Sequence, residues 1–241
     1  MSSNANPDGQ ADQPLEECWD LPSDFDLYTK HEVRMVYYHY PISGNSFRLE
    51  CIEPDTPLDI NNQILSSRQF DATGHCVWAG AILLIRCIQE MKKFEIGGKR
   101  MIEFGCGTGI GGLAMMLIDD ISIIPSYICF TDNDPDALDL CQRNCRLNNV
   151  SNELYSILEL TWGDDDHIAE MFDVALATDV LYEVNLIKPL FRTVSRCIPS
   201  GGVFILSHIP RACYNEGKHW LISFVAFCFQ NNTQVYLYRP T

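Results

Sequence analysis

The sequence predicts an α/β fold: a Rossmann-like parallel sheet with helices on both faces, preceded by a β-hairpin. Short apolar segments alternate with helical segments from residue 78 onward, which is the pattern of a parallel sheet. The first of these apolar segments ends in a cluster of glycines, as in folds that bind a nucleotide at the sheet edge. A chain of 241 residues is long enough to bury the core of one such domain, which we expect over residues 31–241.

The first part of the chain divides into a tail and a hairpin. Residues 1–30 contain seven Asp or Glu residues, one Lys and few apolar side chains, so we predict an acidic disordered tail. Residues 33–40 and 47–52 are rich in β-branched and aromatic side chains, and the segment between them contains Pro, Ser, Gly and Asn. This pattern predicts a β-hairpin over residues 33–52.

The remaining elements follow in regular order. Apolar residues recur at helical spacing from Trp78 to Met91, which predicts a helix ending near Gly97. Strands are predicted over 101–104, 127–130, 154–160, 173–177, 203–207 and 235–238, and helices over 114–118, 134–148, 190–197 and 219–229. Asp134 followed by Pro135 is typical of a helix start. Since sheets of this kind commonly have seven strands, we expect the last strand to be missing.

Charge and cysteine content limit the classes of partner and cellular compartment that we expect. The formal net charge is −15, which repels phosphate backbones, so nucleic acid is not an expected partner. The acidity suits a protein substrate that is basic at its target site, although it also simply favours solubility. Eleven cysteines without a CxxC pair predict small buried side chains in a reducing compartment, and no metal site. Without an apolar run of membrane-spanning length or a secretory signal, we expect a cytoplasmic, also nuclear, monomer.

The glycine cluster predicts a cofactor site. Residues 103–109 read Glu-Phe-Gly-Cys-Gly-Thr-Gly, and such glycines let a ligand approach the backbone at a helix N-terminus. Asp132 ends the next strand, 25 residues beyond Gly107, where a carboxylate can accept hydrogen bonds from both hydroxyls of an adenosine ribose. Both features belong to the carboxyl ends of neighbouring strands. Together they indicate a cofactor that contains adenosine.

Two adenosine cofactors compete for this site. Gly107, Gly109 and Gly112 also fit the dinucleotide pattern G-x-G-x-x-G. However, the first glycine after the strand is Gly105, so the dinucleotide frame starts two residues late. Glu103 precedes the loop, and its carboxylate suits the amino group and sulfonium of S-adenosylmethionine (SAM) better than a pyrophosphate. A hairpin and a helix also precede the first strand of the sheet. These points favour SAM over NAD.

Five short motifs occur in an order that resembles a known family. They are Val-Trp at 77–78, the glycine loop at 103–109, Thr-Asp at 131–132, Leu-Thr-Trp-Gly at 160–163 and Asp-Val-Leu-Tyr at 179–182. Together they resemble the family 16 methyltransferases, seven-β-strand enzymes dominated by protein-lysine methyltransferases. The resemblance covers roughly residues 33–210. The Asp-x-x-Tyr motif, combined with the Trp-Gly pair, is its most specific part.

The resemblance implies roles for individual residues. Asp179 and Tyr182 would face the substrate as the catalytic pair. Trp78 would pack beside the cofactor, Trp162 would lie near the adenine, and the loop backbone would line the methionine part. The cofactor-binding residues implied in this way, together with those indicated by the glycine pattern, are Trp78, Glu103, Gly105, Cys106, Gly107, Gly109, Asp132, Trp162 and Thr178.

The resemblance also implies an activity: transfer of a methyl group from SAM to a protein side chain, in the first place lysine. The alternatives are histidine, arginine or a small amine as the acceptor, and a non-catalytic module that binds SAM or only a partner. For Asp179 the alternative is a helix cap, and for either tryptophan it is a place in the core. The acidic tripeptide at 164–166 is a second candidate for the acceptor site.

Overall fold

The structure is a computed structural model that describes residues 33–39, 45–52, 72–164, 168 and 170–208. It also describes the backbone of residues 223–228 and 234–238. All of these residues belong to one compact unit, which runs from Glu32 to Thr241. The tail predicted over residues 1–30 and the turn of the predicted hairpin lie outside the described residues.

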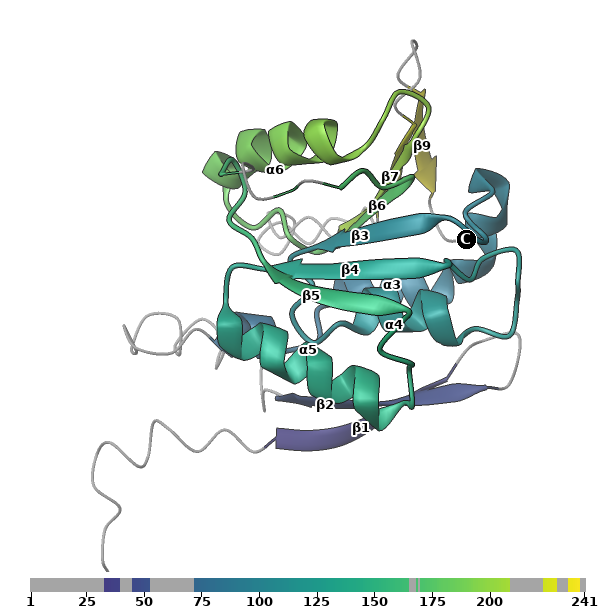
Figure 1. The fold of residues 1–241 in the computed structure, drawn as a ribbon, viewed down its shortest axis with the longest axis vertical. Helices are drawn as coiled ribbons and strands as arrows, with labels where there is room; N and C mark the ends of the chain where they lie inside the picture. The colour runs from purple at the N-terminus through teal and green to yellow at the C-terminus, as the bar shows by residue number, and fades with distance from the viewer. Residues whose placement is uncertain are drawn as a thin grey trace, which may run out of the picture. The chain divides into compact units, whose positions relative to one another are not determined.

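The predicted hairpin is confirmed. Strand β1 (Val33–His39) pairs antiparallel with β2 (Ser46–Ile52), so that His39 lies opposite Ser46. Alternate side chains of β2, at Phe47, Leu49 and Cys51, are buried in the main core. Side chains alternate along a strand, so these three residues lie on the same face of the hairpin. That face packs toward the helices beneath the main sheet (Figure 1).

The main sheet has seven strands among the described residues, in the order β5-β4-β3-β6-β7-β8-β9. Their bounds are β3 (Arg100–Phe104), β4 (Tyr127–Asp132), β5 (Tyr155–Glu159), β6 (Val174–Thr178), β7 (Val203–His208), β8 (Ser223–Cys228) and β9 (Gln234–Tyr238). Strands β3 to β7 run parallel, as predicted. From β3 the chain first adds β4 and β5 on one side of the sheet and then β6 and β7 on the other side. Ligands bind at the carboxyl edge beside such a switch point, here between β3 and β6, in open α/β sheets.

The C-terminal part corrects two predictions. A helix was predicted over residues 219–229, but residues 223–228 form β8, which pairs antiparallel with both β7 and β9. The prediction of a missing last strand is therefore wrong, because the strand lies where the helix was expected. A short apolar run does not distinguish helix from strand by its period. The hydrogen-bonding partners on both sides favour the extended form, and they come from distant parts of the chain.

Helices cover both faces of the sheet, as predicted (Figure 1). Their bounds are α3 (Ala79–Arg86), α4 (Ile110–Leu117), α5 (Pro135–Leu147) and α6 (Val184–Cys197). Helices α3, α4 and α5 pack on the face that carries Met101 and Leu176, whereas α6 packs on the face that carries Ile102 and Ala175. No helix in the described part of the chain is long and apolar enough to cross a membrane.

Three helix boundaries differ from the predictions. Helix α4 begins at Ile110 rather than at residue 114. The helix expected from Trp78 to Gly97 is α-helical only as far as Arg86, and Ile88–Phe94 continues as the 3-10 helix η2. Helix α6 begins at Val184 rather than at residue 190, and it contains Pro189. Proline usually marks a helix boundary because it cannot donate a backbone hydrogen bond. Pro189 lies in the second turn of α6, so only one helical hydrogen bond is lost, the one to the carbonyl four residues earlier.

Asn144 joins the hairpin, α5 and the glycine loop, a role that the sequence did not reveal. Its amide nitrogen donates to the backbone oxygens of Glu50 (3.0 Å) and Thr108 (2.9 Å), and its oxygen accepts from the N–H of Glu50 (2.7 Å). One turn later, Asn148 makes the same paired contacts with the backbone of Arg48. Two amides spaced by one helical turn therefore hold the edge of β2.

We expect Asn144→Ala to lower the free energy of unfolding by about 2–4 kcal/mol, because it leaves buried backbone groups without partners. Asn148→Ala is the matched control. It removes a similar set of hydrogen bonds at a more exposed position, where water can replace them, so its cost should be about 1 kcal/mol. Urea denaturation of the full chain measures both values. Equal losses in the two variants would show that burial of Asn144 adds nothing.

Candidate functional site

A cavity of about 480 Å³ lies at the carboxyl edge of the parallel strands. Volumes of several hundred Å³ are typical of sites for small molecules and cofactors. Its wall combines the glycine loop, the ends of β4 and β6, and the first turns of α6 with the segment before α3. The lining residues that matter below are Thr73, Gly74, Trp78, Gly105, Cys106, Gly107, Asp132, Asp134, Trp162, Thr178, Asp179, Tyr182, Glu183, Leu186 and Pro189.

The cavity is acidic. Its described lining includes the carboxyl groups of Asp132, Asp134, Asp179 and Glu183, and no lysine or arginine. A pyrophosphate is doubly anionic and would be repelled by such a wall, whereas the sulfonium and ammonium of SAM would be attracted. The charge of the wall therefore favours a cationic ligand over a dinucleotide.

The glycine loop turns sharply between β3 and α4, and Asp132 holds it in place. Gly105 and Gly107 have φ values of 63° and 50°, a region that side chains rarely adopt. A Cβ atom on Gly107 would lie 2.8 Å from the carbonyl oxygen of Gly74, so the two loops touch through their backbones. The N–H of Gly107 donates to Asp132 Oδ2 at 2.9 Å. The carboxylate predicted to bind ribose therefore also shapes the loop.

Asp132 has a second partner in the protein and remains at the cavity. Its Oδ1 accepts from the N–H of Asp134 at 3.1 Å, and the side chain is 8% exposed. Burial raises the pKa of the Asp132 carboxyl, against the lowering effect of the N–H of Gly107. Because each carboxylate oxygen has two lone pairs, both can still accept from ligand hydroxyls.

The two tryptophans predicted near the cofactor both line the cavity. The ring of Trp162 lies against the glycine loop: a Cβ atom on Gly105 would be 3.3 Å from Trp162 Cζ2. Trp78 is the residue just before α3, and its indole N–H donates to the carbonyl oxygen of Thr73 at 2.9 Å. That bond fixes the indole beside the cavity through the chain's own backbone.

Glu103 does not reach the cavity, which corrects its predicted contact with the cofactor. Side chains alternate along β3, so Glu103 points to the face covered by α4 and not to the strand end. It is fully buried, and its Oε2 accepts from the N–H of Gly112 at 2.9 Å. Gly112, the last glycine of the dinucleotide pattern, leaves room for this carboxyl, since a Cβ atom there would lie 2.7 Å from Oε2. This glycine serves helix packing.

Glu103 should make the stability of the protein depend on pH. Burial raises the pKa of its carboxyl from 4.5 to about 8, and the nearby Asp132 adds to the rise. Between these two values the folded chain holds a proton that the unfolded chain releases. The free energy of unfolding should therefore fall as pH rises through this window, by at most about 1.4 kcal/mol per pH unit, and then level off. Below pH 4.5 both states are protonated and this contribution is constant.

The matched variant is Glu103→Gln, whose amide oxygen still accepts from Gly112 but does not titrate. We expect its unfolding free energy to decline less than that of the parent between pH 5 and 8, and the difference between the two curves isolates Glu103. Urea denaturation across this range is the measurement. Parallel curves for parent and variant would contradict a protonated Glu103.

Asp179 sits at the base of the cavity in a constrained conformation. It follows β6 with a φ of 59°, and side-chain-bearing residues with positive φ store about 1–3 kcal/mol of strain. Its Oδ2 accepts from the N–H of Gly80 at 2.9 Å, and its Oδ1 lies 3.2 Å from His208 Nδ1. The carboxylate thus caps the N-terminus of α3, not the helix that follows it in sequence. Such strain is concentrated at functional sites.

The other predicted residues divide into two groups. Tyr182 lines the cavity with 51% of its surface exposed, and Thr178 lines it from the last position of β6. Cys106 also lines it, but burial raises the pKa of its thiol to about 12, so it stays protonated at neutral pH. Gly109 does not line the cavity: it is the residue just before α4. Of the tripeptide at 164–166, only Asp164 lies within the described residues.

The described cysteines fit the expected buried role. All eight are buried and carry free thiols: Cys51, Cys76, Cys87, Cys106, Cys129, Cys141, Cys145 and Cys197. The described residues contain no group of three or more His, Cys, Asp or Glu side chains suited to hold a metal ion.

Three residues that the sequence analysis missed hold the Asp179 side of the cavity. Gly80 donates its N–H to Asp179, and its carbonyl accepts from the hydroxyl of Ser207 at 2.6 Å. A Cβ atom on Gly80 would lie 2.9 Å from Asp179 Cγ, so only glycine fits. His208 ends β7 at the same edge of the sheet. The rule that selected Asp132 and Asp179, a polar residue closing a parallel strand, also selects His208.

Comparison with known proteins gives one family and several relatives. The profile of a family described as lysine methyltransferase matches residues 53–224, more than two thirds of the chain. An EEF1A lysine methyltransferase 3 from Xenopus tropicalis is 31% identical over 54% of this chain and 56% of its own length. A calmodulin-lysine N-methyltransferase from Arabidopsis thaliana is 28% identical over 66% of this chain and 53% of its own length.

A third relative acts on a different side chain by its name. A histidine protein methyltransferase 1 homolog from Dictyostelium discoideum is 28% identical over 54% of this chain and 40% of its own length. The chain therefore spans about half the length of the curated relatives that it matches.

Proposed function

This chain belongs to the lysine methyltransferase family, and from that premise we propose that it transfers a methyl group from SAM to a lysine side chain of a protein. The observation that carries the proposal is the acidic cavity at the switch point of the sheet, whose described lining has four carboxyl groups and no lysine or arginine. Both the proposed cofactor and the proposed acceptor are cations. The names of two relatives as lysine methyltransferases support the choice of acceptor.

The residues present fit SAM. Gly105 and Gly107 offer a wall of backbone without side chains, and Asp132 offers a carboxylate for the ribose. The exposed part of the Trp162 ring would lie beside the adenine. SAM supplies a methyl group that its sulfonium has already activated, so the protein has to bind, align and keep water out.

Asp179 and Tyr182 would handle the acceptor. The Asp179 carboxylate, fixed by Gly80, would hold the ammonium of the incoming lysine by a charge-assisted hydrogen bond. His208 does not line the cavity; its Nδ1 lies 3.2 Å from the same carboxylate, so it would act only by holding Asp179 in place. The half-exposed ring of Tyr182 would shape the entrance of the slot.

The cofactor is tested by calorimetric titration of the full chain. We expect binding of SAM and S-adenosylhomocysteine, and no heat with NAD, because the wall repels a pyrophosphate. Heat with NAD alone would identify an oxidoreductase. Absence of binding to all three would favour a non-catalytic interaction module.

The acceptor is tested by incubating the chain with radiolabelled SAM and a cell lysate, then locating the label by mass spectrometry. Lysine is the expected side chain. Label on histidine would favour the second candidate, which the Dictyostelium relative supports, and label on arginine or on a small amine would contradict a lysine acceptor as well.

The proposal also covers the oligomeric state of the protein, its location in the cell and its binding to nucleic acid. We propose a monomer in the cytoplasm and nucleus that does not bind nucleic acid, supported by its free thiols and its net charge of −15. Cell fractionation and light scattering test location and oligomeric state, and a DNA-binding assay tests the last point.

A further inference from the structure

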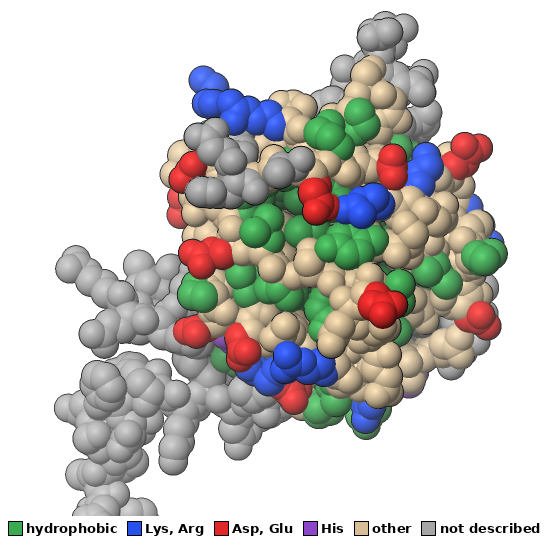
Figure 2. Space-filling view, viewed as in Figure 1, with side chains coloured by type: hydrophobic (Ala, Val, Ile, Leu, Met, Phe, Trp, Pro, Cys, Tyr) green, Lys and Arg blue, Asp and Glu red, His purple; other side chains and the backbone are tan. Residues whose placement is uncertain are grey.

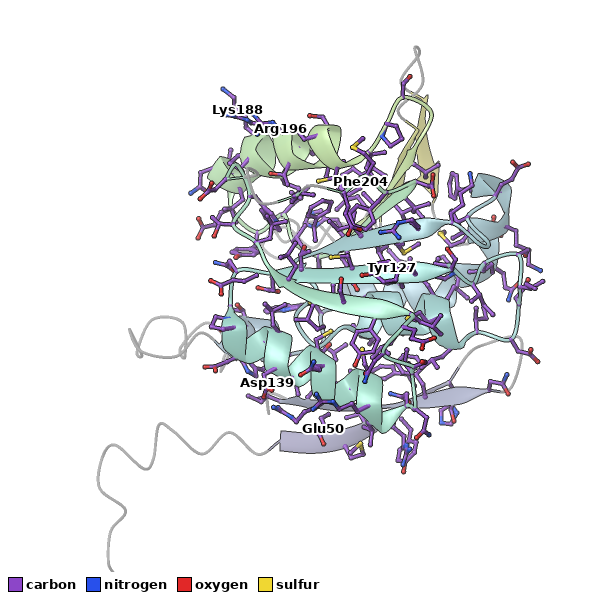
Figure 3. The ribbon with its side chains drawn as sticks, in the orientation of Figure 1. Glu50, Tyr127, Asp139, Lys188, Arg196 and Phe204 are labelled. Carbon is purple, nitrogen blue, oxygen red and sulfur yellow. The ribbon has the colours of Figure 1, made fainter. Side chains whose placement is uncertain are left out.

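Helix α6 carries a row of basic side chains that the proposed chemistry does not use. Lys188, Arg192 and Arg196 are spaced four residues apart, so they lie on one face of the helix. All three are exposed, while the opposite face, with Leu190 and Val194, is buried against the sheet. Figure 3 shows Lys188 and Arg196 projecting outward from α6, and Figure 2 shows blue side chains gathered at the same corner. We call these three residues the basic row.

The basic row is unusual for this chain. Between residues 147 and 210 there are nine acidic residues and three basic ones, and all three basic ones belong to the row. Helix α6 itself contains no Asp or Glu. In a protein with a net charge of −15, added bases do not improve solubility. Solubility therefore does not account for the row.

The row also works against the stability of the helix. Lys188 and Arg192, and then Arg192 and Arg196, are like-charged pairs at the i, i+4 spacing, which destabilises a helix. Only Arg196, in the last turn, interacts favourably with the helix dipole. No carboxylate lies three or four residues from Lys188 or Arg192 on the helix to offset the repulsion between these two. An acidic partner would relieve it.

The row lies on the helix that also borders the cavity. Glu183, Leu186 and Pro189 line the cavity from the start of α6, and the basic row continues along the outer side of the same helix. With a rise of about 1.5 Å per residue, Lys188 is about 8 Å and Arg196 about 20 Å from Glu183 along the axis. A protein whose lysine enters the cavity beside the start of α6 can therefore bring its neighbouring surface to the basic row.

We propose that the basic row of α6 docks an acidic patch of the protein substrate, about 8–20 Å along the helix axis from Glu183 at the cavity. This inference rests on the proposed function and narrows the substrate class to proteins that carry an acidic patch beside the target lysine. Charge complementarity selects this partner. Without the row, an acidic substrate would meet only the repulsion of a strongly negative protein.

Binding to the row is tested with a short fluorescent polyglutamate peptide at low salt, by anisotropy on the full chain. The triple variant Lys188→Glu, Arg192→Glu, Arg196→Glu should bind it at least about tenfold more weakly than the parent. The control Lys92→Glu, Lys93→Glu, Arg146→Glu makes the same change of net charge at exposed sites elsewhere and should change affinity by less than about twofold. Arg192→Lys with Arg196→Lys keeps the charge and should bind as the parent does.

The role in transfer is tested with the labelled lysate and then with the labelled protein. The α6 variant should raise KM for that protein about tenfold, leaving kcat and SAM affinity unchanged. The labelled proteins should carry an acidic patch near the labelled lysine. If the parent chain binds SAM but labels no protein, the proposed function is contradicted. The peptide assay would still show whether the basic row binds acidic groups. If the α6 variant labels and binds as the parent does, the inference is wrong and the proposed function stands.

Two other occupants would also overturn the inference. Stronger binding of a single-stranded nucleic acid than of polyglutamate, lost in the α6 variant, would assign the row to phosphates. The chain's own residues 1–30 carry seven acidic side chains. Replacing these with Asn and Gln in the full chain should leave peptide affinity unchanged, and a tenfold gain would assign the row to that segment.

Discussion

Asp179→Asn is expected to reduce methyl transfer by about 100-fold, because the amide cannot hold an ammonium by charge. Charge-assisted hydrogen bonds contribute about 1.5–3 kcal/mol, and about 2.7 kcal/mol corresponds to a factor of 100 in rate. The amide oxygen can still accept from the N–H of Gly80, so the fold and SAM affinity should change little. Loss of the charge at the start of α3 should cost only about 0.3–1 kcal/mol of stability.

The comparison that gives this result its meaning is Tyr182→Phe. This variant keeps the exposed ring that shapes the slot and removes only the hydroxyl, so it should retain more activity than Asp179→Asn. Rates are measured on the labelled protein, with thermal unfolding and SAM titration as controls for folding. An inactive Tyr182→Phe beside an active Asp179→Asn would reverse the two roles. Full activity in both would make the motif structural and move the search to the loop at 164–166.

Asp132→Ala is expected to lower SAM affinity by at least about tenfold, since about 1.4 kcal/mol is a factor of ten and one lost charged hydrogen bond exceeds that. The structure adds a second cause. The variant also removes the acceptor for Gly107 and for Asp134, so the glycine loop loses its support. Asp132→Asn retains one oxygen for one of these donors and should cost less stability. Calorimetry and urea denaturation separate the two effects.

The matched control is Asp134→Asn, which also lines the cavity. Asn caps a helix as well as Asp does, so α5 should keep the cap that Asp134 now gives to the N–H of Asp136. We expect SAM affinity to change by less than about threefold. If Asp134→Asn weakens SAM as much as Asp132→Ala does, the ribose ligand has been assigned to the wrong carboxylate.

Much of the fold could be predicted because its signals are local. The period of two in residues 47–52, the Asp-Pro start of α5 and the apolar core strands all act within a few residues, and the structure agrees with each. The error at residues 223–228 has the opposite cause. Whether that segment becomes helix or strand depends on β7 and β9, which offer it a hydrogen-bonded ladder on each side.

The sequence by itself determined the parallel sheet, the glycine loop and the acid that closes each of two strands, because residue type and spacing prescribe backbone geometry directly. Only the tertiary structure decided what each side chain faces. The pleat of β3 turns Glu103 beneath α4, and the fold brings Gly80 and His208 to Asp179 across distant parts of the chain. Burial and hydrogen bonding depend on such neighbours, so they arise only once the chain has packed.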